Sequence, residues 1–228
     1  MPQVAIFIGP PGSGKDTQAE LLSVEYGFTL VPTSQIIRAQ FAEHPDDPMI
    51  LQEKQLFDAG KLNTSEWVAG LVLEFVRARV AEGKSVVLAG SPRNVPEVRV
   101  ELEEFLTLFG VHGIGVFHLQ LSEQEARARI AKRRFCRANN HTIPGTPEFA
   151  HLTVCPHDQS EFFVRPFDDV SLQDVRFAAY RELTEPCLAV LAEAGCAVHA
   201  IDASKTIQSI HQDIVGILER QREPTPTL

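Results

Sequence analysis

Positions 9–15, Gly-Pro-Pro-Gly-Ser-Gly-Lys, have the residue types and spacing of a loop that binds phosphate groups. Glycines let the backbone curl so that successive N–H groups point inward, and a helix that begins at the end of the loop adds the positive end of its dipole. Lys15 would bring a positive charge to the terminal phosphates of a nucleotide. The residues expected to contact these phosphates are Gly9, Pro10, Pro11, Gly12, Ser13, Gly14, Lys15, Asp16 and Thr17.

Asp16 occupies the position where many such loops carry a Ser or Thr that contacts magnesium, and Thr17 comes one place later. Within the first helical turn, the backbone N–H of Thr17 could still meet a phosphate. One interpretation is that the Asp16 carboxylate reaches the water shell of Mg²⁺, which accepts oxygen ligands and keeps several waters. The other is that Asp16 stabilises the helix N-terminus, where an anion contributes about 0.3–1 kcal/mol. At the level of sequence both interpretations stay open.

The elements that must position this loop alternate between short apolar runs and helical patterns, which predicts a parallel β-sheet covered on both faces by helices. The expected strands are residues 4–8, 28–31, 84–90, 113–121 and 196–202. The expected helices are residues 13–25, 34–43, 48–59, 64–82, 95–109, 122–134 and 206–220. The predicted fold class is α/β, a doubly wound five-stranded parallel sheet of the P-loop type, with the phosphate loop at the carboxyl end of the first strand.

Residues 135–166 interrupt this alternation, since they contain four prolines and no helical period. Aromatic and β-branched residues alternate in the segment, which favours a small hairpin-like lid over disorder. We expect the last residues, 221–228, to fray.

The bulk composition limits the classes of partner and compartment. Lys and Arg number 21 against 30 Asp and Glu, a net charge of −9, which argues against nucleic acid or an anionic membrane as the main partner. We find no signal-peptide pattern and no apolar run approaching the roughly 20 residues that span a bilayer. Four cysteines are too sparse to predict a disulfide scaffold. We therefore expect a cytoplasmic protein, and a monomer.

Further motifs follow the phosphate loop in a fixed order. They are PTSQIIR (32–38), FDAGKLNT (57–64), VVLAGSPRNVPE (86–97), ARIAKRR (128–134), RPFDDVSLQDVRFAAY (165–180) and IDASKTIQSI (201–210). Together with the GKDTQ that ends the loop, they resemble the adenylate kinase family of nucleoside monophosphate kinases over nearly the whole chain. The resemblance implies phosphoryl transfer from Mg·ATP to a nucleoside monophosphate. It also implies a core of residues 1–32, 63–134 and 167–220 with two mobile inserts, a monophosphate-binding one at 33–62 and a lid at 135–166.

Arginines are suited to this reaction, because phosphoryl transfer crowds phosphate oxygens and the guanidinium group grips phosphate at two points. By resemblance, Arg38 and Arg93 would hold the monophosphate, and Arg165 and Arg176 would close over the transferring group. Arg129 would stack on the ATP base and Arg133 would meet its phosphates; four residues apart, they share one helix face. Lys205 lies in the turn near the ATP base. The catalytic set implied is Lys15, Arg93, Arg133, Arg165 and Arg176.

The resemblance also implies which residues bind the monophosphate. They are Thr33, Arg38, Lys61, Leu62, Asn63, Gly90, Arg93 and Glu97. Thr33 favours AMP, since relatives that prefer pyrimidine monophosphates tend to have Ala there. Glu97 stands where adenylate kinases have Gln, and an ionised carboxylate only accepts hydrogen bonds, which suits guanine better. The alternative is that Glu97 points to solvent. We expect AMP as the first choice.

Ala89 is a departure, because the family usually has Asp at the start of DGFPR, where it helps to hold hydrated magnesium. Here the sequence is AGSPRN, which suggests that Asp16 replaces the missing carboxylate. Ala89, Glu97 and Phe167 also motivate an alternative, a nucleotide-binding protein with weak or no catalysis that acts as a sensor or assembly factor. A third alternative is a kinase of another small molecule, but the matches at Arg38 and Arg93 favour a nucleotide acceptor.

The expected lid carries two cysteines, Cys136 and Cys155, at two of the four positions where some relatives hold structural zinc. The other two positions are Asn139, a poor zinc ligand, and Asp158. A set of Cys136, His141 and Cys155 with either His157 or Asp158 could bind zinc. The alternative is a polar cluster held by hydrogen bonds, which the absence of a Cys-x-x-Cys spacing favours.

Overall fold

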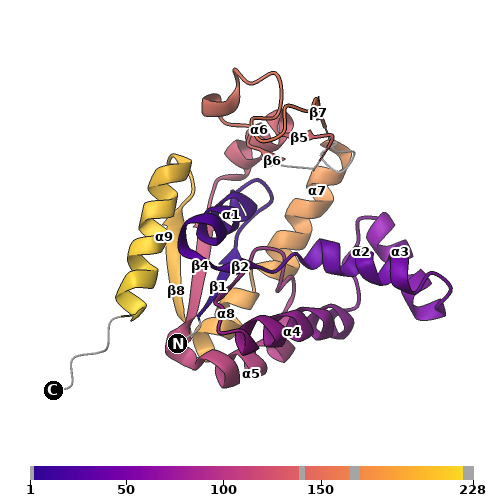
Figure 1. Cartoon of the computed structure of the whole chain (residues 1–228), viewed down its shortest axis with the longest axis vertical. Helices are drawn as coiled ribbons and strands as arrows, with labels where there is room; N and C mark the ends of the chain where they lie inside the picture. The colour runs from indigo at the N-terminus through magenta and orange to yellow at the C-terminus, as the bar shows by residue number, and fades with distance from the viewer. Residues whose placement is uncertain (1–2, 139–141, 165–169, 223–228) are drawn as a thin grey trace.

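The computed structural model describes residues 3–138, 142–164 and 170–222. Its centre is a five-stranded parallel sheet in the order β2-β3-β1-β4-β8 (Figure 1). The strands are β1 (Val4–Ile8), β2 (Thr29–Leu30), β3 (Val86–Leu88), β4 (Ile114–Gln120) and β8 (Ala197–Asp202). The first strand lies in the middle, as an open doubly wound sheet requires. This confirms the predicted α/β class.

Alternate residues of β1 enter two separate hydrophobic cores, because successive side chains of a strand point to opposite faces. Val4, Ile6 and Ile8 face the core built with helices α4 (Ser65–Ala81), α5 (Val95–Phe109) and α8 (Cys187–Glu193). Ala5 and Phe7 face the core built with α1 (Lys15–Tyr26) and α9 (Ile207–Arg222). All five β1 residues are buried, which holds the loop that follows them on a rigid base.

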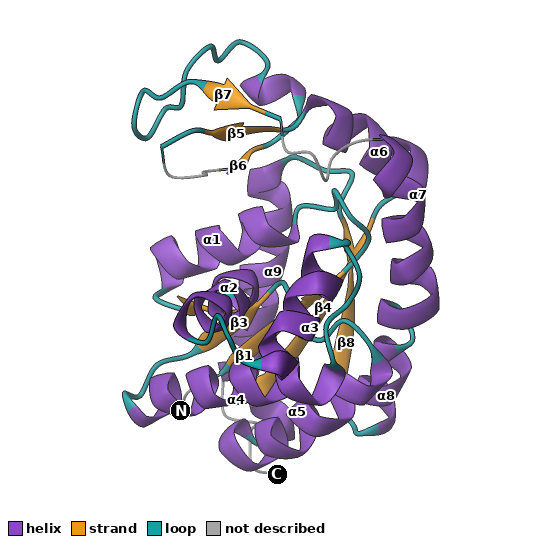
Figure 2. Cartoon of the chain, turned by 90° about the vertical axis from the view of Figure 1, so that its right-hand side faces the viewer, coloured by secondary structure: helices purple, strands orange, loops and turns teal. Residues whose placement is uncertain are grey.

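Two further groups of elements extend from this core (Figures 1 and 2). The first group is formed by helices α2 (Thr33–Glu43) and α3 (Pro48–Asp58), which follow β2 and precede α4 in the sequence. A separate antiparallel sheet, in the order β6-β5-β7, consists of β5 (Arg134–Cys136), β6 (Thr142–Ile143) and β7 (Phe162–Phe163). Among its described residues, the segment expected to be a hairpin-like lid therefore contains strands of this small sheet and a 3₁₀ turn, η2 (Pro147–Phe149).

Helices α6 (Glu123–Lys132) and α7 (Val170–Ala179) connect this small sheet to the core. Ser122 caps α6, accepting the backbone N–H of Glu125 at 3.2 Å. A π-helical turn, Tyr180–Thr184, follows α7, and a 3₁₀ turn, η1 (Val111–Gly113), precedes β4. Among the described residues, no helix is both long and apolar enough to cross a membrane.

Several boundaries differ from those expected. The helix after the phosphate loop begins at Lys15 rather than residue 13, because Gly14 has a left-handed conformation (φ +94°) that ends the loop. The helix expected at 122–134 stops at Lys132, since the chain then enters β5. Helix α8 was not predicted; at seven residues, it is too short to show a clear helical period.

Candidate active site

The phosphate loop is shaped by two glycines that no other residue could replace without strain. Gly12 has a φ of +82°, and a Cβ there would lie 2.8 Å from the Ala126 carbonyl oxygen of α6. A Cβ on Gly9 would lie 2.6 Å from the carbonyl oxygen of Leu119. The loop is thus packed directly on β4 and α6, so the helix that carries Arg129 is held against it.

Lys15 begins α1 and turns its side chain back over the loop. Its Nζ donates to the carbonyl oxygens of Gly9 at 2.7 Å and Pro10 at 2.9 Å. Burial lowers the pKa of Lys15 to about 7, Asp16 opposes this, and Arg93, Arg176 and Arg133 lower it further. The lysine therefore lies in a field made positive by three guanidinium groups.

These three arginines come from separate elements. Arg93 follows β3, Arg133 lies at the end of α6, and Arg176 belongs to the last turns of α7. The Nε of Arg93 donates to the carbonyl oxygen of Gly90 at 2.8 Å, and the Arg133 guanidinium lies 5.1 Å from the centre of the Phe135 ring. The structure thus brings together four of the five residues expected to be catalytic, while Arg165 lies outside the described residues.

Two residues expected near the ATP base lie on different elements. Arg129 is one turn before Arg133 on α6, and burial lowers its pKa from the usual arginine value. Lys205, in the turn before α9, is exposed and donates to Asp213 at 2.8 Å. An arginine half enclosed by protein can stack on a planar ring, whereas the exposed lysine has a carboxylate partner already.

On the monophosphate side, Thr33 is 8% exposed, and its Oγ1 has no hydrogen-bond partner among the described residues. A Cβ on Gly90 would lie 3.3 Å from this oxygen, so the start of α2 lies against the turn after β3. Arg38 lies 4.7 Å above the centre of the Phe57 ring. A buried hydroxyl without a partner is uncommon in native proteins and marks a place where a ligand atom could bind.

The segment before α4 also has an internal anchor. The Nδ2 of Asn63 donates to the carbonyl oxygen of Glu53 at 2.7 Å and to its carboxylate at 2.9 Å. The exposed Lys61 and the partly buried Leu62 precede this anchor. The Asn63 side chain therefore fixes the segment, and its amide nitrogen is already engaged within the protein.

Glu97 is 1% exposed, so the alternative that it points to solvent is wrong. One carboxylate oxygen accepts the backbone N–H of Arg93 at 2.6 Å, and the other accepts Nδ2 of Asn94 at 3.0 Å. Burial raises the pKa of Glu97, although these bonds and the Arg93 charge act in the opposite direction. Glu97 therefore supports the backbone at Arg93.

A second buried carboxyl, Glu101, was missed in the sequence. It is 0% exposed and hydrogen-bonds to the Ser91 hydroxyl. Burial raises its pKa to about 8, with a smaller contribution from Glu97. A signal was present, because Glu97, Glu101 and Phe105 are spaced four apart and so share the face of α5 that Phe105 buries.

The two positions considered for magnesium differ in chemistry. Asp16 is exposed in the first turn of α1, and its charge raises the pKa of Lys15. Ala89, directly after β3, is 5% exposed and packs in the core beneath α1 and α9. Oxygen ligands are what Mg²⁺ requires, and of these two positions only Asp16 supplies them.

In the expected lid, Cys136, Cys155 and Asp158 place one potential ligand atom each within 4.8 Å of one another. The Cys136 thiol donates to an Asp158 carboxylate oxygen at 3.2 Å. The other oxygen of Asp158 accepts the N–H of Ser160 at 3.0 Å. Of the two alternatives for the fourth member, this group contains Asp158 rather than His157, while His141 and Asn139 lie outside the described residues.

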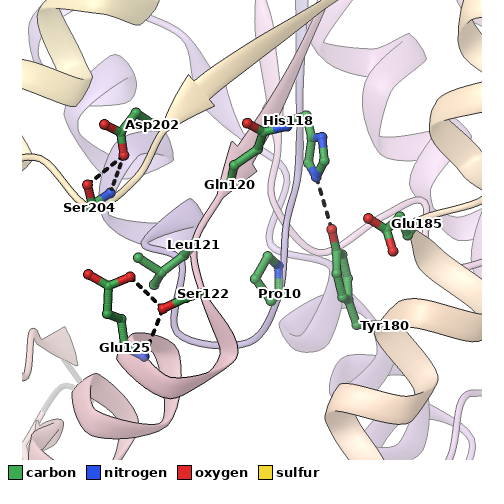
Figure 3. A pocket seen from close by; sticks show the side chains of 10 residues that line it. All are labelled: Pro10, His118, Gln120, Leu121, Ser122, Glu125, Tyr180, Glu185, Asp202 and Ser204. Carbon is green, nitrogen blue, oxygen red and sulfur yellow. Dashed lines mark hydrogen bonds between the residues drawn. The ribbon is translucent and has the colours of Figure 1, made fainter.

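A cavity of about 470 Å³ lies beside Pro10, near the carboxyl ends of β4 and β8 (Figure 3). Its carboxylates are Glu125, Glu185 and Asp202. His118, from β4, bonds to the Tyr180 hydroxyl across it at 3.1 Å, and burial lowers the pKa of this histidine. Three carboxylates without a lysine or arginine in the lining disfavour phosphate, so the Lys15 face of the loop is the better site for a polyphosphate.

Comparison with known proteins gives a consistent result. A family model described as adenylate kinase matches residues 7–196. A curated adenylate kinase of Archaeoglobus fulgidus is 30% identical over 218 residues, covering 94% of this chain and 97% of the relative. One from Carboxydothermus hydrogenoformans is 29% identical, covering 94% and 99%. One from Fusobacterium nucleatum is 32% identical over 216 residues, covering 93% and 97%.

Proposed function

Because the chain belongs to the adenylate kinase family and is thus a nucleoside monophosphate kinase, we propose that it transfers the terminal phosphoryl group of Mg·ATP to AMP. The observation that carries this proposal is the convergence of Arg93, Arg133 and Arg176 on Lys15. Four cationic side chains from separate elements interact here, and the three arginines each lower the pKa of Lys15, so an anion that enters the site would be favoured. A polyphosphate chain is such an anion, and protein groups placed in this way stabilise phosphoryl transfer by electrostatics.

In the proposed reaction the protein contributes position and charge. Lys15 and the loop N–H groups hold the ATP phosphates, while Arg133 and Arg176 neutralise charge on the transferring group. Arg93 and Arg38 orient the monophosphate so that its oxygen faces the terminal phosphorus. We assign Arg165 to the same group by resemblance, and Arg129 and Lys205 to the base of ATP.

Magnesium, when bound with ATP, neutralises charge on the phosphate oxygens. We propose that Asp16 holds part of the water shell of this ion. The support is that Asp16 lies beside Lys15 with an exposed carboxylate, whereas Ala89 has no ligand atom. Mg²⁺ retains several waters in protein sites, so the Asp16 carboxylate on α1 could hold these waters in place of a carboxylate at position 89, after β3.

We propose adenine as the preferred base of the monophosphate. The unpartnered Oγ1 of Thr33 lies beside Gly90, where it can bond to a ligand. Both oxygens of Glu97 already accept bonds from Arg93 and Asn94, so the argument for guanine through Glu97 loses its support. Adenine does not require a free carboxylate at Glu97, so it fits this site better than guanine.

For the lid we propose a cluster held by hydrogen bonds rather than by zinc. The potential ligand atoms of Cys136, Cys155 and Asp158 lie within 4.8 Å of one another, and the side chain of Cys155 hydrogen-bonds to both of the others. The bond from Cys136 to Asp158 already joins two of these. Metal analysis of the purified protein tests this, and one zinc per chain would contradict it.

The experiment that tests the function mixes the protein with ATP, Mg²⁺ and one of AMP, GMP, CMP or UMP, and measures the diphosphates formed. We expect ADP from ATP and AMP, with slower reaction of the other three. Nucleotide binding without any transfer would favour a sensor or assembly role. A strong preference for GMP would contradict the assignment of the base.

A further inference from the structure

Behind Arg93 lies a group of buried polar side chains that the proposed reaction does not use: Ser91, Asn94, Glu97 and Glu101. Glu101 is the most enclosed of these, with 0% exposure. One of its carboxyl oxygens bonds to the Ser91 hydroxyl, and the other has no partner among the described residues. Within the part of the chain that the structure describes, Glu101 forms no ion pair with a lysine, arginine or histidine.

An ionised Glu101 would therefore be an uncompensated charge in the protein interior. Such a charge is costly, and a carboxyl group in this position keeps its proton instead. Glu97, four residues away on the same helix, adds repulsion, and burial is the larger cause that raises the pKa of Glu101 to about 8. At neutral pH the side chain is thus a neutral carboxylic acid with one O–H to donate.

This proton determines the direction of a hydrogen-bond chain. A protonated Glu101 donates to Ser91, whose own hydroxyl is then free to point at Glu97, 3.5 Å away. The same oxygen of Glu97 accepts the backbone N–H of Arg93 at 2.6 Å. The chain of hydrogen bonds therefore leads from Glu101, on the buried face of α5, to the backbone N–H of Arg93.

Asn94 attaches this chain to a neighbouring helix. Its Nδ2 donates to Glu97, and its Oδ1 accepts the N–H of Glu97 at 2.9 Å and the hydroxyl of Ser65, at the start of α4, at 3.1 Å. On the other side, Thr184 donates to the carbonyl oxygen of Arg93 at 2.7 Å. The backbone at Arg93 is thus fixed at both its N–H and its carbonyl group.

We propose that Glu101, in its protonated form, is a positioning residue of the monophosphate site, acting through Ser91 and Glu97 on the backbone of Arg93. The inference rests on the proposed role of Arg93 in holding the monophosphate. Glu101 lies behind this residue and contacts no reacting group. A neutral carboxyl can donate to Ser91 and leave Glu97 as the single negative charge beside the Arg93 N–H.

Two described groups near Arg93 titrate in this pH range: Glu101 within the cluster, and Lys15, which interacts with Arg93 from the phosphate loop and has a pKa of about 7. In the proposed reaction Lys15 holds the ATP phosphates, so its titration affects the KM for ATP, whereas Glu101 affects the binding of AMP. On α5 itself Glu97 carries the negative charge, and Arg93 precedes the helix. From α8 comes the thiol of Cys187, whose pKa burial raises to about 12, with smaller contributions from Glu97 and Glu101, so that it stays neutral. From α4 comes the hydroxyl of Ser65. The ion pair of Arg77 with Glu104 lies on the exposed side of α5.

Loss of the Glu101 proton would place a second negative charge beside Glu97. The Ser91 hydroxyl would then donate to Glu101, and Glu97 would lose that donor. We therefore expect the affinity for AMP to fall as the pH rises above about 8, the pKa of Glu101.

The test compares the wild-type protein with Glu101→Gln, which keeps a neutral donor of the same shape. The matched control is Glu103→Gln, since Glu103 is exposed on the same helix. Binding of AMP alone is measured by calorimetry from pH 6.5 to 9.5, and the KM values for AMP and ATP are measured over the same range. We expect the wild-type Kd for AMP to rise roughly three- to tenfold between pH 7 and 9, since one protonation is coupled to binding. Glu101→Gln should remain flat and Glu103→Gln should follow the wild type.

Two further measurements separate positioning from a merely structural role. Glu101→Leu, which has no donor, should weaken AMP binding at every pH, while the KM for ATP follows the wild-type profile. Carboxyl ¹³C NMR of the wild type should show one glutamate titrating near pH 8, which tests the inference even if a variant fails to fold.

Equal AMP profiles in the wild type and Glu101→Gln, or a Glu101 signal that titrates in the ordinary range, would overturn the inference. Failure of the proposed function gives a different result. In that case the wild type forms no ADP from ATP and AMP, while calorimetry of AMP alone still decides the role of Glu101.

Discussion

Lys15 and Glu101 are both enclosed titratable side chains, and burial is the first cause of the pKa shift of each. The pKa of Lys15 falls to about 7, and that of Glu101 rises to about 8. Each shift disfavours the charged form, which is the expected effect of removing a charge from water. The two differ in what could restore the charge.

Lys15 lies at the start of a helix, beside loop N–H groups and three arginines that repel it, so an anion that enters this site favours the charged lysine. Around Glu101, the hydrogen bond from Ser91 favours the charged form and the charge of Glu97 disfavours it, while burial outweighs both, so nothing there restores the charge. We therefore expect Lys15 to take up a proton when a polyphosphate binds. The cluster behind Arg93, in contrast, requires Glu101 to keep its proton throughout. Desolvation alone thus does not distinguish a binding group from a positioning group; the neighbouring charges do.

The largest effect should come from removing the lysine. Lys15→Met should lower kcat/KM by about 10³-fold, because a preorganised charge at the transferring phosphoryl group is lost. Steady-state kinetics with ATP and AMP measure this. The control is Lys84→Met, since Lys84 is exposed and pairs with Glu82 at the surface. A loss of less than tenfold at Lys15 would contradict its place at the centre of the site.

Replacing the buried acid should affect stability instead. In the unfolded chain Glu101 ionises above about pH 4.5, whereas in the folded protein it keeps its proton to about pH 8. The unfolded state therefore binds fewer protons in this window, and the free energy of unfolding falls as the pH rises from 4.5 to 8. Glu101→Gln should remove this loss and be more stable than the wild type by roughly 2–4 kcal/mol at pH 8.

Denaturant unfolding at pH 5 and pH 8 measures the difference between the two proteins. Glu103→Gln, on the exposed side of the same helix, should show no such gain. A Glu101→Gln variant that is less stable than the wild type at pH 8 would show that the wild-type carboxyl is ionised and paired there.

The sequence was sufficient for one of these two regions. Glycines, a lysine and the strand before them have a fixed spacing, because the loop must curl around phosphate, and this spacing identified the loop and its helix. The arginines were placed by resemblance, and their convergence depends on how α6, α7 and the turn after β3 are arranged around the phosphate loop. This arrangement is set by tertiary packing, which no local sequence pattern contains.

Glu101 lies in a run of acidic residues, Glu97, Glu101, Glu103 and Glu104, that has the composition of a solvated helix face. Cys187 lies close enough to interact with Glu101, and it belongs to α8, a helix too short to predict. The spacing with Phe105 and Phe109 indicated the buried face, but charge normally outweighs such a pattern. Ser91 stands where the family motif DGFPR has Phe. Its hydroxyl provides the hydrogen-bond partner that the buried carboxyl of Glu101 needs.

The pH dependence of ATP binding should reflect Lys15 and not Glu101. Above about pH 7 the lysine is neutral in the free protein, so it must take up a proton when a polyphosphate binds. The KM for ATP should therefore rise by up to about tenfold per pH unit above pH 7, the limit for one coupled proton. Kinetics at fixed, saturating AMP measure this, and Glu101→Gln should leave the slope unchanged. A KM for ATP that is constant from pH 7 to 9 would mean that Lys15 remains charged without a ligand.

The smallest effect should come from Asp16, whose negative charge raises the pKa of Lys15 while its own carboxylate is exposed. Asp16→Asn should lower the pKa of Lys15, so the rise in KM for ATP should begin at a lower pH, by a few tenths of a unit, since solvent screens an exposed charge. If Asp16 also holds the water shell of magnesium, the Mg²⁺ concentration for half-maximal rate should rise several-fold. A shifted pH profile with an unchanged magnesium requirement would restrict Asp16 to electrostatics at the helix N-terminus, and the magnesium ligand would then have to come from the nucleotide and its waters.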